Sequence, residues 1–149
     1  MSGIKTITDP VGDEHFAIFA PFVATDAAIS RGDVVCMDGS GDVIASATAN
    51  LSRVVGVASN DAAVGEIVMV QIYGYCDYVT TDGDLATSDL ALQALDGGVA
   101  GGVTEAEIAA DGTLGFHIFA RGLGVADTGT VGTCFITAMG ANSGTTDDS

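Results

Sequence analysis

The feature that most constrains this chain is a series of short β-branched runs, punctuated by glycine turns, in the stretch Gly32–Ile72. Val34–Val35 and Val43–Ile44 flank the turn Asp38–Gly41. Glycine reaches positive φ there without steric cost, and Asp and Ser side chains hydrogen-bond the local backbone. The pattern predicts a β-hairpin followed by two more strands. These strands are expected in the apolar runs Arg53–Ala58 and Ile67–Ile72.

A second copy of this layout, longer in its middle, follows in the C-terminal half. Four landmarks recur in the same order, and about a dozen extra residues are expected within Thr104–His117. Gly-Val-Ala also recurs by chance in a chain rich in these residues, and that alternative stays open. Duplication predicts pseudo-repeated halves at about 32–79 and 88–139. The matched positions are Asp33 with Asp89, Val43 with Val99, Gly56 with Gly124, Gly65 with Gly132, and Val70 with Ile136.

The predicted domain organisation is one β domain, residues 15–139, between a flexible N-terminal arm, 1–14, and a disordered acidic tail, 140–149. The domain begins with a strand at His15–Val23. Pro21 lacks the N–H that a central strand needs, so this strand should lie at an edge or end at the proline. The 21 glycines oppose long helices. We expect an all-β fold, a compact β-barrel or β-sandwich of short strands with at most one short helix.

Four later segments complete this expectation. The first, Leu85–Leu95, fits a helix or a strand, and its period-2 leucines favour a strand. The second, Thr104–Ala110, has a capping-box spacing that predicts the short helix. The last two, Thr113–Ala120 and Gly122–Ala126, are expected to be strands, before the final strand at 132–139.

The charge balance excludes two classes of partner. Twenty acidic residues against four basic ones give a net charge of −16, and the four bases are scattered along the chain. Binding to nucleic acid needs clustered Lys and Arg, so neither nucleic acid nor an anionic membrane is an expected partner. The acidity serves solubility or suits a saline habitat, and the sequence leaves both open. We also expect no signal peptide and no membrane span.

The three cysteines are predicted to be free and buried. Cys36, Cys76 and Cys134 all lie in apolar, strand-like runs. An odd number of cysteines without Cys-x-x-Cys spacing fits neither a disulfide framework nor a zinc site. Small apolar side chains in a protein made in a reducing cytoplasm explain them best.

No motif with assignable chemistry emerges. Asp38–Asp42 and Asp82–Asp84 lack the calcium-loop pattern and are interpreted as turns. Neither His15 nor His117 has a partner marked by the sequence, and Gly97–Gly102 is not followed by the lysine of a phosphate-binding loop. We therefore expect no catalytic residue, no metal ligand and no cofactor. The chain is predicted to be an interaction or scaffold protein and not an enzyme.

The glycine-centred motifs resemble those of the capsid decoration (cement) proteins of tailed bacteriophages. The resemblance covers about Gly32–Tyr78 well and the second half loosely, where the insertion departs from the shortest family members. It implies a compact β-barrel or β-sandwich that binds the outer surface of the capsid lattice and stabilises the DNA-filled head. It also implies the major capsid protein as partner, a homotrimer, and a place on the virion after synthesis in the host cytoplasm. The matching residues are Gly32, Asp33, Val35, Gly56, Val57, Ala58, Gly65 and Gly74.

Phe16, Phe19 and Phe22 are the candidate contacts with the capsid or a neighbouring subunit. They lie on the predicted edge strand, and an unpaired edge can accept another strand. The alternative function is a β-rich ligand- or carbohydrate-binding module, for which the tyrosines between 73 and 78 would supply the aromatic platform. A hydrolase that uses the scattered acids is a third, weaker hypothesis.

Overall fold

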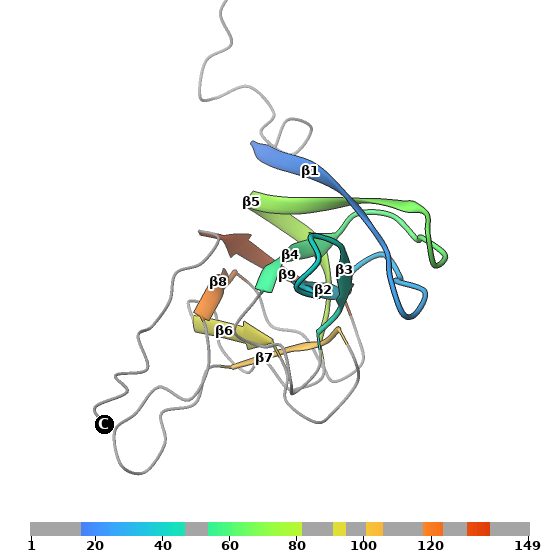
Figure 1. Cartoon of the computed structure of the whole chain (residues 1–149). Helices are drawn as coiled ribbons and strands as arrows, with labels where there is room; N and C mark the ends of the chain where they lie inside the picture. Colours follow the sequence, from blue (N-terminus) through green and yellow to red (C-terminus); the bar gives the residue numbers. More distant parts are fainter. Residues whose placement is uncertain are drawn as a thin grey trace, which may run out of the picture.

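The computed structural model describes residues 16–46, 54–81, 91–94, 101–105, 118–123 and 131–137. All regular secondary structure in these ranges is β-strand, and every strand pairs with its neighbours antiparallel (Figure 1). The prediction of an all-β fold is therefore confirmed. The nine strands are β1 (Ala17–Val23), β2 (Val34–Met37), β3 (Val43–Ala45), β4 (Val54–Ala58), β5 (Ile67–Thr80), β6 (Ala91–Ala94), β7 (Val103–Glu105), β8 (Ile118–Gly122) and β9 (Val131–Ile136).

The first hairpin forms where the turn chemistry predicts it. Met37 of β2 lies opposite Val43 of β3, and the Asp38 N–H donates to the Asp42 carbonyl at 3.0 Å. The Ser40 N–H and hydroxyl both donate to the Asp38 carboxylate at 2.7 Å. Gly41 has a φ of +107°, and a Cβ added there would have no other atom within 4 Å, so only the backbone conformation requires glycine.

The strand order is symmetric about the central pair of strands. The sheet runs β3-β2-β4-β5-β9-β8-β6-β7. When β2–β5 are exchanged one by one with β6–β9, the same order results, read from the other end. The irregularities also correspond. The β2–β4 register shifts between Val35 and Cys36, and the β6–β8 register shifts between Leu92 and Gln93. The two halves thus share one topology, although the duplication in evolution stays a prediction.

Paired residues of the two halves can be compared directly. Val34 lies opposite Val57, and Leu92 lies opposite Ala120. All four belong to one buried cluster, so the two pairs occupy similar places. Gly124, which the sequence motifs match with Gly56, lies outside the described residues, and that match stays a prediction.

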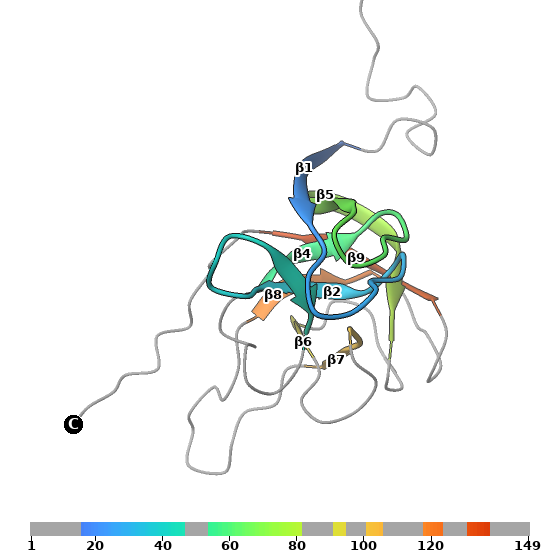
Figure 2. The same cartoon turned by 45° about the vertical axis from the view of Figure 1, so that its right-hand side comes forward.

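β5 is the strand on which the two halves meet. Its first part pairs with β1 on one edge and with β4 on the other, and its second part pairs with β9. Ala17 at the start of β1 and Ile136 at the end of β9 both lie opposite Gly74. Because a residue pairs with one strand on each edge, β1 and β9 lie on opposite edges of β5, and β9 follows β4 along the edge away from β1. Figures 1 and 2 show β1 at one end of the molecule, beyond β5.

The sheet curls without closing into a continuous barrel. β3 and β7 are its end strands, and no ladder between them is present in the described residues. The β7 end nevertheless contacts the first half, because the Val34 N–H donates to the Gly101 carbonyl at 2.7 Å and Thr81 forms a bridge with Val103. A barrel-like curl, more than a two-sheet sandwich, describes this arrangement.

Alternating side chains supply two apolar clusters, one on each face of the first half. The first lies inside the curl and takes residues from both halves: Val34, Val57, Cys76, Val79, Leu92, Val103, Ala120, Cys134 and Ile136. The second lies beneath the loops around Ile29 and Ala62. Its buried members are Ala24, Ile29, Val35, Val43, Val55, Ala58, Ala62, Val68 and Val70. Neighbours such as Val34 and Val35 face opposite clusters, as the period of a strand requires.

One local prediction for the second half is wrong. Thr104 and Glu105, expected to begin a short helix, belong to β7 and pair with β6. There a strand partner distant in sequence decides the structure over the local signal. β8 contains the last three residues of the strand expected at 113–120 and ends at Gly122, while 113–117 and 124–126 lie outside the described residues. The arm, the tail and both histidines lie outside the described residues.

Candidate interaction surface

β1 is an edge strand, as Pro21 predicts. It pairs with β5 on one side, and no other described strand pairs with its outer side. Pro21 lies opposite Met69 and Val23 lies opposite Ile67. An edge strand directs alternate N–H and C=O groups away from its partner, where another chain can pair with them. The proline interrupts that row of donors, which limits how regular such a pairing can be.

One face of the two-stranded ribbon formed by β1 and β5 is apolar and exposed. We call it the apolar ribbon face. Directly opposite residues of an antiparallel pair project to the same face, and so do residues two apart on one strand. Ile67 is 62% exposed and Phe19 is 45% exposed. The face comprises Phe19, Pro21, Val23, Ile67 and Met69, all of them exposed.

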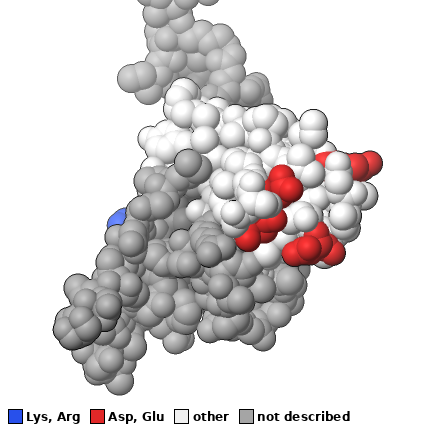
Figure 3. Space-filling view, viewed as in Figure 1, with Lys and Arg blue, Asp and Glu red and all other residues white. Residues whose placement is uncertain are grey.

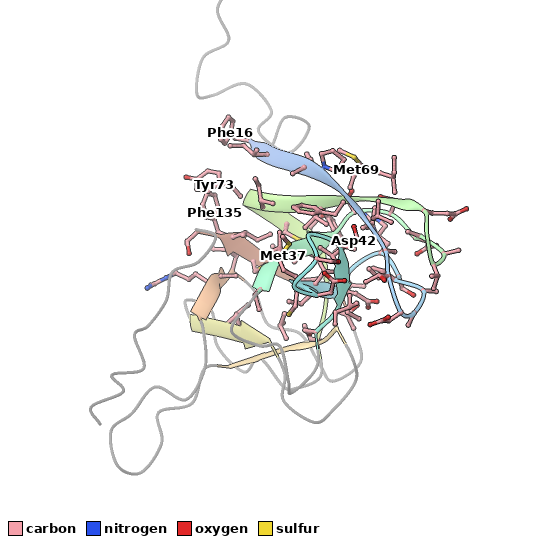
Figure 4. The ribbon with its side chains drawn as sticks, viewed as in Figure 1. Phe16, Met37, Asp42, Met69, Tyr73 and Phe135 are labelled. Atoms are coloured by element: carbon pink, nitrogen blue, oxygen red, sulfur yellow. The ribbon has the colours of Figure 1, made fainter. Side chains whose placement is uncertain are left out.

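A second apolar feature, the aromatic junction, lies where β1, β5 and β9 meet. The rings of Phe16 and Tyr73 are edge-to-face with centroids 5.9 Å apart. The rings of Tyr73 and Phe135 are also edge-to-face, at 5.4 Å. Figure 4 shows these three side chains one after another on one side of the molecule. Phe16 is 67% exposed, so the row continues from the half-buried Phe135 out to solvent. Each such ring pair contributes roughly 0.5–1.5 kcal/mol beyond its buried area.

Glycine at position 74 permits this junction. Its φ is +103°, and a Cβ there would lie 2.0 Å from the Phe16 carbonyl oxygen. No other residue allows the β1 backbone to approach so closely. The two backbones can therefore lie in contact only because residue 74 has no side chain.

A buried glutamine supports β5 on both sides of this glycine. The Gln71 side-chain amide donates to the Tyr75 carbonyl at 2.7 Å and to the Tyr73 carbonyl at 3.3 Å. The Tyr78 hydroxyl donates to the Gln71 Oε1 at 2.5 Å. The Arg31 guanidinium lies 4.2 Å from the centroid of the Tyr78 ring. Burial raises the pKa of Tyr78, so this hydroxyl stays a donor.

Among the described residues, no acidic side chain belongs to the apolar ribbon face. No charged residue occurs in β1 or in the first half of β5, Ile67–Gly74. Figure 3 shows acidic side chains gathered over the turns on one side of the molecule, while the surface over β1 has none. In those turns, hydrogen bonds from Ser40 hold the pKa of Asp38 below its ordinary value. Burial instead raises the pKa of Asp33.

The three predicted contact residues do not lie on one surface. Phe16 belongs to the aromatic junction and Phe19 to the apolar ribbon face. Phe22 is half-buried and packs against the second apolar cluster. The β1–β5 register shifts between Ile18 and Phe19, so both of these residues are exposed and the simple alternation is interrupted.

Sequence reasoning missed the β5 residues of the apolar ribbon face. Ile67 and Met69 were predicted only as part of an apolar strand, in which their neighbours Val68 and Val70 are the buried residues. The strict alternation was visible in the sequence. Only the edge position of β1 reveals that the outward pair remains exposed.

The described residues contain no cluster of three or more His, Cys, Asp or Glu side chains that could hold a metal ion. In the same part of the chain, no helix has the length and apolarity of a membrane span. The three tyrosines considered as a carbohydrate platform are each partly buried. Tyr73 sits between two aromatic rings, and Tyr78 packs against the first cluster. They do not present one flat exposed platform.

Comparisons with known proteins add a fold likeness. No family model matches the chain, and no curated protein matches it. Among solved structures, the fold is similar to that of the head fiber gp8.5 N base of bacteriophage phi29, with a TM-score of 0.54. The alignment covers 82% of this chain and 95% of that one, at 15% sequence identity. At this identity the likeness is one of fold.

Proposed function

We propose that this chain is a structural protein of a phage virion that attaches to the outer surface of the capsid and stabilises the DNA-filled head. Two independent lines support the proposal. The glycine-centred motifs resemble those of capsid decoration proteins, and the fold is similar to the base of a phage head fiber. The proposed role makes and breaks no covalent bond, and its partner is the major capsid protein.

The observation that carries the proposal is the apolar ribbon face on a strongly acidic chain. At a net charge of −16, most of the surface disfavours close approach to another acidic body. β1 and the first half of β5 are free of charge and present large apolar side chains. Covering this face contributes about 4 kcal/mol per copy by apolar burial. Many copies on one lattice multiply that contribution, since opening the shell must break several contacts at once.

The proposal includes a homotrimer on the particle, which rests on the family resemblance alone. In solution at low salt, mutual repulsion of the acidic chains favours the monomer. A particle reconstruction tests this part separately. Isolated copies that do not touch one another would exclude the trimer without affecting attachment through the apolar ribbon face.

The test measures protein bound per particle together with the melting temperature of the particle. Purified protein added to heads that lack it should bind saturably and raise that temperature, because a partner that binds only the intact shell stabilises it by mass action. Added salt should not abolish binding, since apolar burial carries it. Saturable binding that leaves the melting temperature unchanged would eliminate the stabilising role.

A matched pair of variants tests the surface itself. Ile67 and Val131 each begin a strand and are 62% and 61% exposed. Ile67→Asp places a charge on the apolar ribbon face and should weaken binding at least tenfold. Val131→Asp makes the same chemical change outside that face and should leave binding unchanged. Equal effects of the two substitutions would show that the general charge matters and not this face.

A further inference from the structure

Two of the three cysteines face each other across the central strand pair. Cys76 of β5 and Cys134 of β9 are direct partners in the antiparallel register. Such partners project to the same face, with Cα atoms about 4.5 or 5.5 Å apart according to the type of pair. Both separations lie within the range of roughly 4.4–6.8 Å that a disulfide spans. Both side chains are fully buried in the first apolar cluster.

The two thiols already interact. A hydrogen bond joins them, and it lowers the pKa of Cys76. The same hydrogen bond, together with burial, raises the pKa of Cys134. One member of the pair is therefore the better nucleophile and the other remains protonated beside it.

Cys36 provides a natural comparison within the same chain. Its strand partners are Ile44 and Val54, so no described cysteine lies opposite it. Burial raises the pKa of Cys36 to about 12. It is buried as completely as the other two cysteines but has no partner sulfur.

We propose that Cys76 and Cys134 are a reversible oxidation site, at which a small two-electron oxidant creates a disulfide that locks β5 to β9. With the diazene oxidant diamide, the Cys76 thiolate adds to the N=N bond and the second nitrogen takes up a proton. The Cys134 sulfur then attacks the Cys76 sulfur. The S–S bond forms as the S–N bond breaks, and the hydrazine leaves with the second proton. The two thiols lose two electrons in total, and a dithiol reductant reverses the step by exchange. In a reducing cytoplasm both sulfurs stay thiols.

The disulfide would join the two symmetric halves of the sheet. Within the described residues, the β5–β9 pair is the only ladder between β2–β5 and β6–β9. The two cysteines are 58 positions apart in sequence, so the bond closes a long loop of the unfolded chain. That constraint should raise the melting temperature of the protein by about 10 °C.

The experiment treats the purified full chain with diamide and maps the peptides without reduction. A Cys76–Cys134 crosslink is expected, with Cys36 still free, and the rise in melting temperature should disappear after addition of a dithiol. Cys36→Ala should retain both the crosslink and the temperature shift. Cys134→Ala should lose both. Each shift compares the oxidised and reduced forms of one variant, so any destabilisation by the substitution itself cancels.

Burial of the sulfurs makes access to the oxidant the critical condition. The reaction is therefore repeated in urea below the unfolding midpoint, where local opening admits the reagent. No crosslink under either condition would overturn the proposal. Random pairing that includes Cys36, or a Cys76–Cys134 bond that leaves the melting temperature unchanged, would also overturn it. Capsid binding plays no part in this test.

Discussion

Replacing Gly74 with alanine should detach β1 from the sheet. The added Cβ would lie 2.0 Å from the Phe16 carbonyl oxygen and 2.9 Å from the Ala17 Cα, both of them backbone atoms. Neither can move without shifting the strand. A φ of +103° adds backbone strain of about 1–2 kcal/mol for a side-chain-bearing residue. Forced overpacking typically costs another 1–3 kcal/mol. We expect Gly74→Ala to reduce the free energy of unfolding by about 3 kcal/mol in total.

Two other glycines separate the two contributions. Gly41 has a φ of +107° but nothing within 4 Å of a Cβ, so Gly41→Ala should show the strain alone, about 1 kcal/mol. Gly56 has no positive φ, but a Cβ there would lie 2.0 Å from the Gln71 carbonyl oxygen. Because Gly56 lies in β4, between β2 and β5, that strand cannot move aside, and Gly56→Ala should disrupt the whole sheet.

Urea unfolding measures the free energies, and amide hydrogen exchange locates the damage. In Gly74→Ala, exchange should accelerate in β1 while the amides of β2 and β4 keep their protection, since an edge strand can separate by itself. In Gly41→Ala, protection of β1 should be unchanged. The reasoning is refuted if Gly74→Ala and Gly41→Ala agree within about 0.5 kcal/mol, the scatter of ordinary surface substitutions.

Three further substitutions test the hydrogen bonds and electrostatics of the first half. Ser40→Ala should raise the pKa of Asp38, which NMR titration measures. The lowered pKa of Asp38 in the folded protein contributes stability that is present above the ordinary pKa of 3.8 and is lost as pH falls through the lowered pKa. Ser40→Ala should diminish this contribution. Asp33 has the opposite sign, because its raised pKa gives stability at low pH that is lost as pH rises. In urea unfolding, the free energy of unfolding of Asp33→Asn should therefore rise relative to that of the wild type as the pH increases from 3.8 toward neutrality. Tyr78→Phe should cost about 1–2 kcal/mol by the same assay, since it leaves the buried Gln71 oxygen without its donor.

The elements that sequence reasoning located correctly are those whose cause is local. The Asp38–Gly41 turn carries its own hydrogen bonds, so the first hairpin was predictable. Pro21 excluded β1 from a central position. All three cysteines are buried, as their placement in apolar runs predicted. Each of these conclusions depends on residues within one turn or one strand.

What the sequence could not show depends on pairing between distant strands. Thr104 has a good capping-box partner, yet β6 recruits it into a strand. The candidate surface was half predicted for the same reason. Phe16 and Phe19 come from the predicted edge, but Ile67 and Met69 join them only through the β1–β5 register.

The candidate surface occurs where the symmetry of the fold fails. In the symmetric core, β2–β5 and β6–β9 repeat one topology, and β9 covers the second part of β5. The first part of β5 also pairs with β1, which comes from outside the repeat and lies on the edge opposite β4 and β9. A strand added at an edge brings one face to the core and leaves its other face without a covering layer. Phe22 and Val68 lie on the face that packs against the core, while Phe19 and Met69 lie on the face that stays exposed. One strand added to a scaffold of two similar halves therefore creates this candidate surface without disturbing the core that holds it.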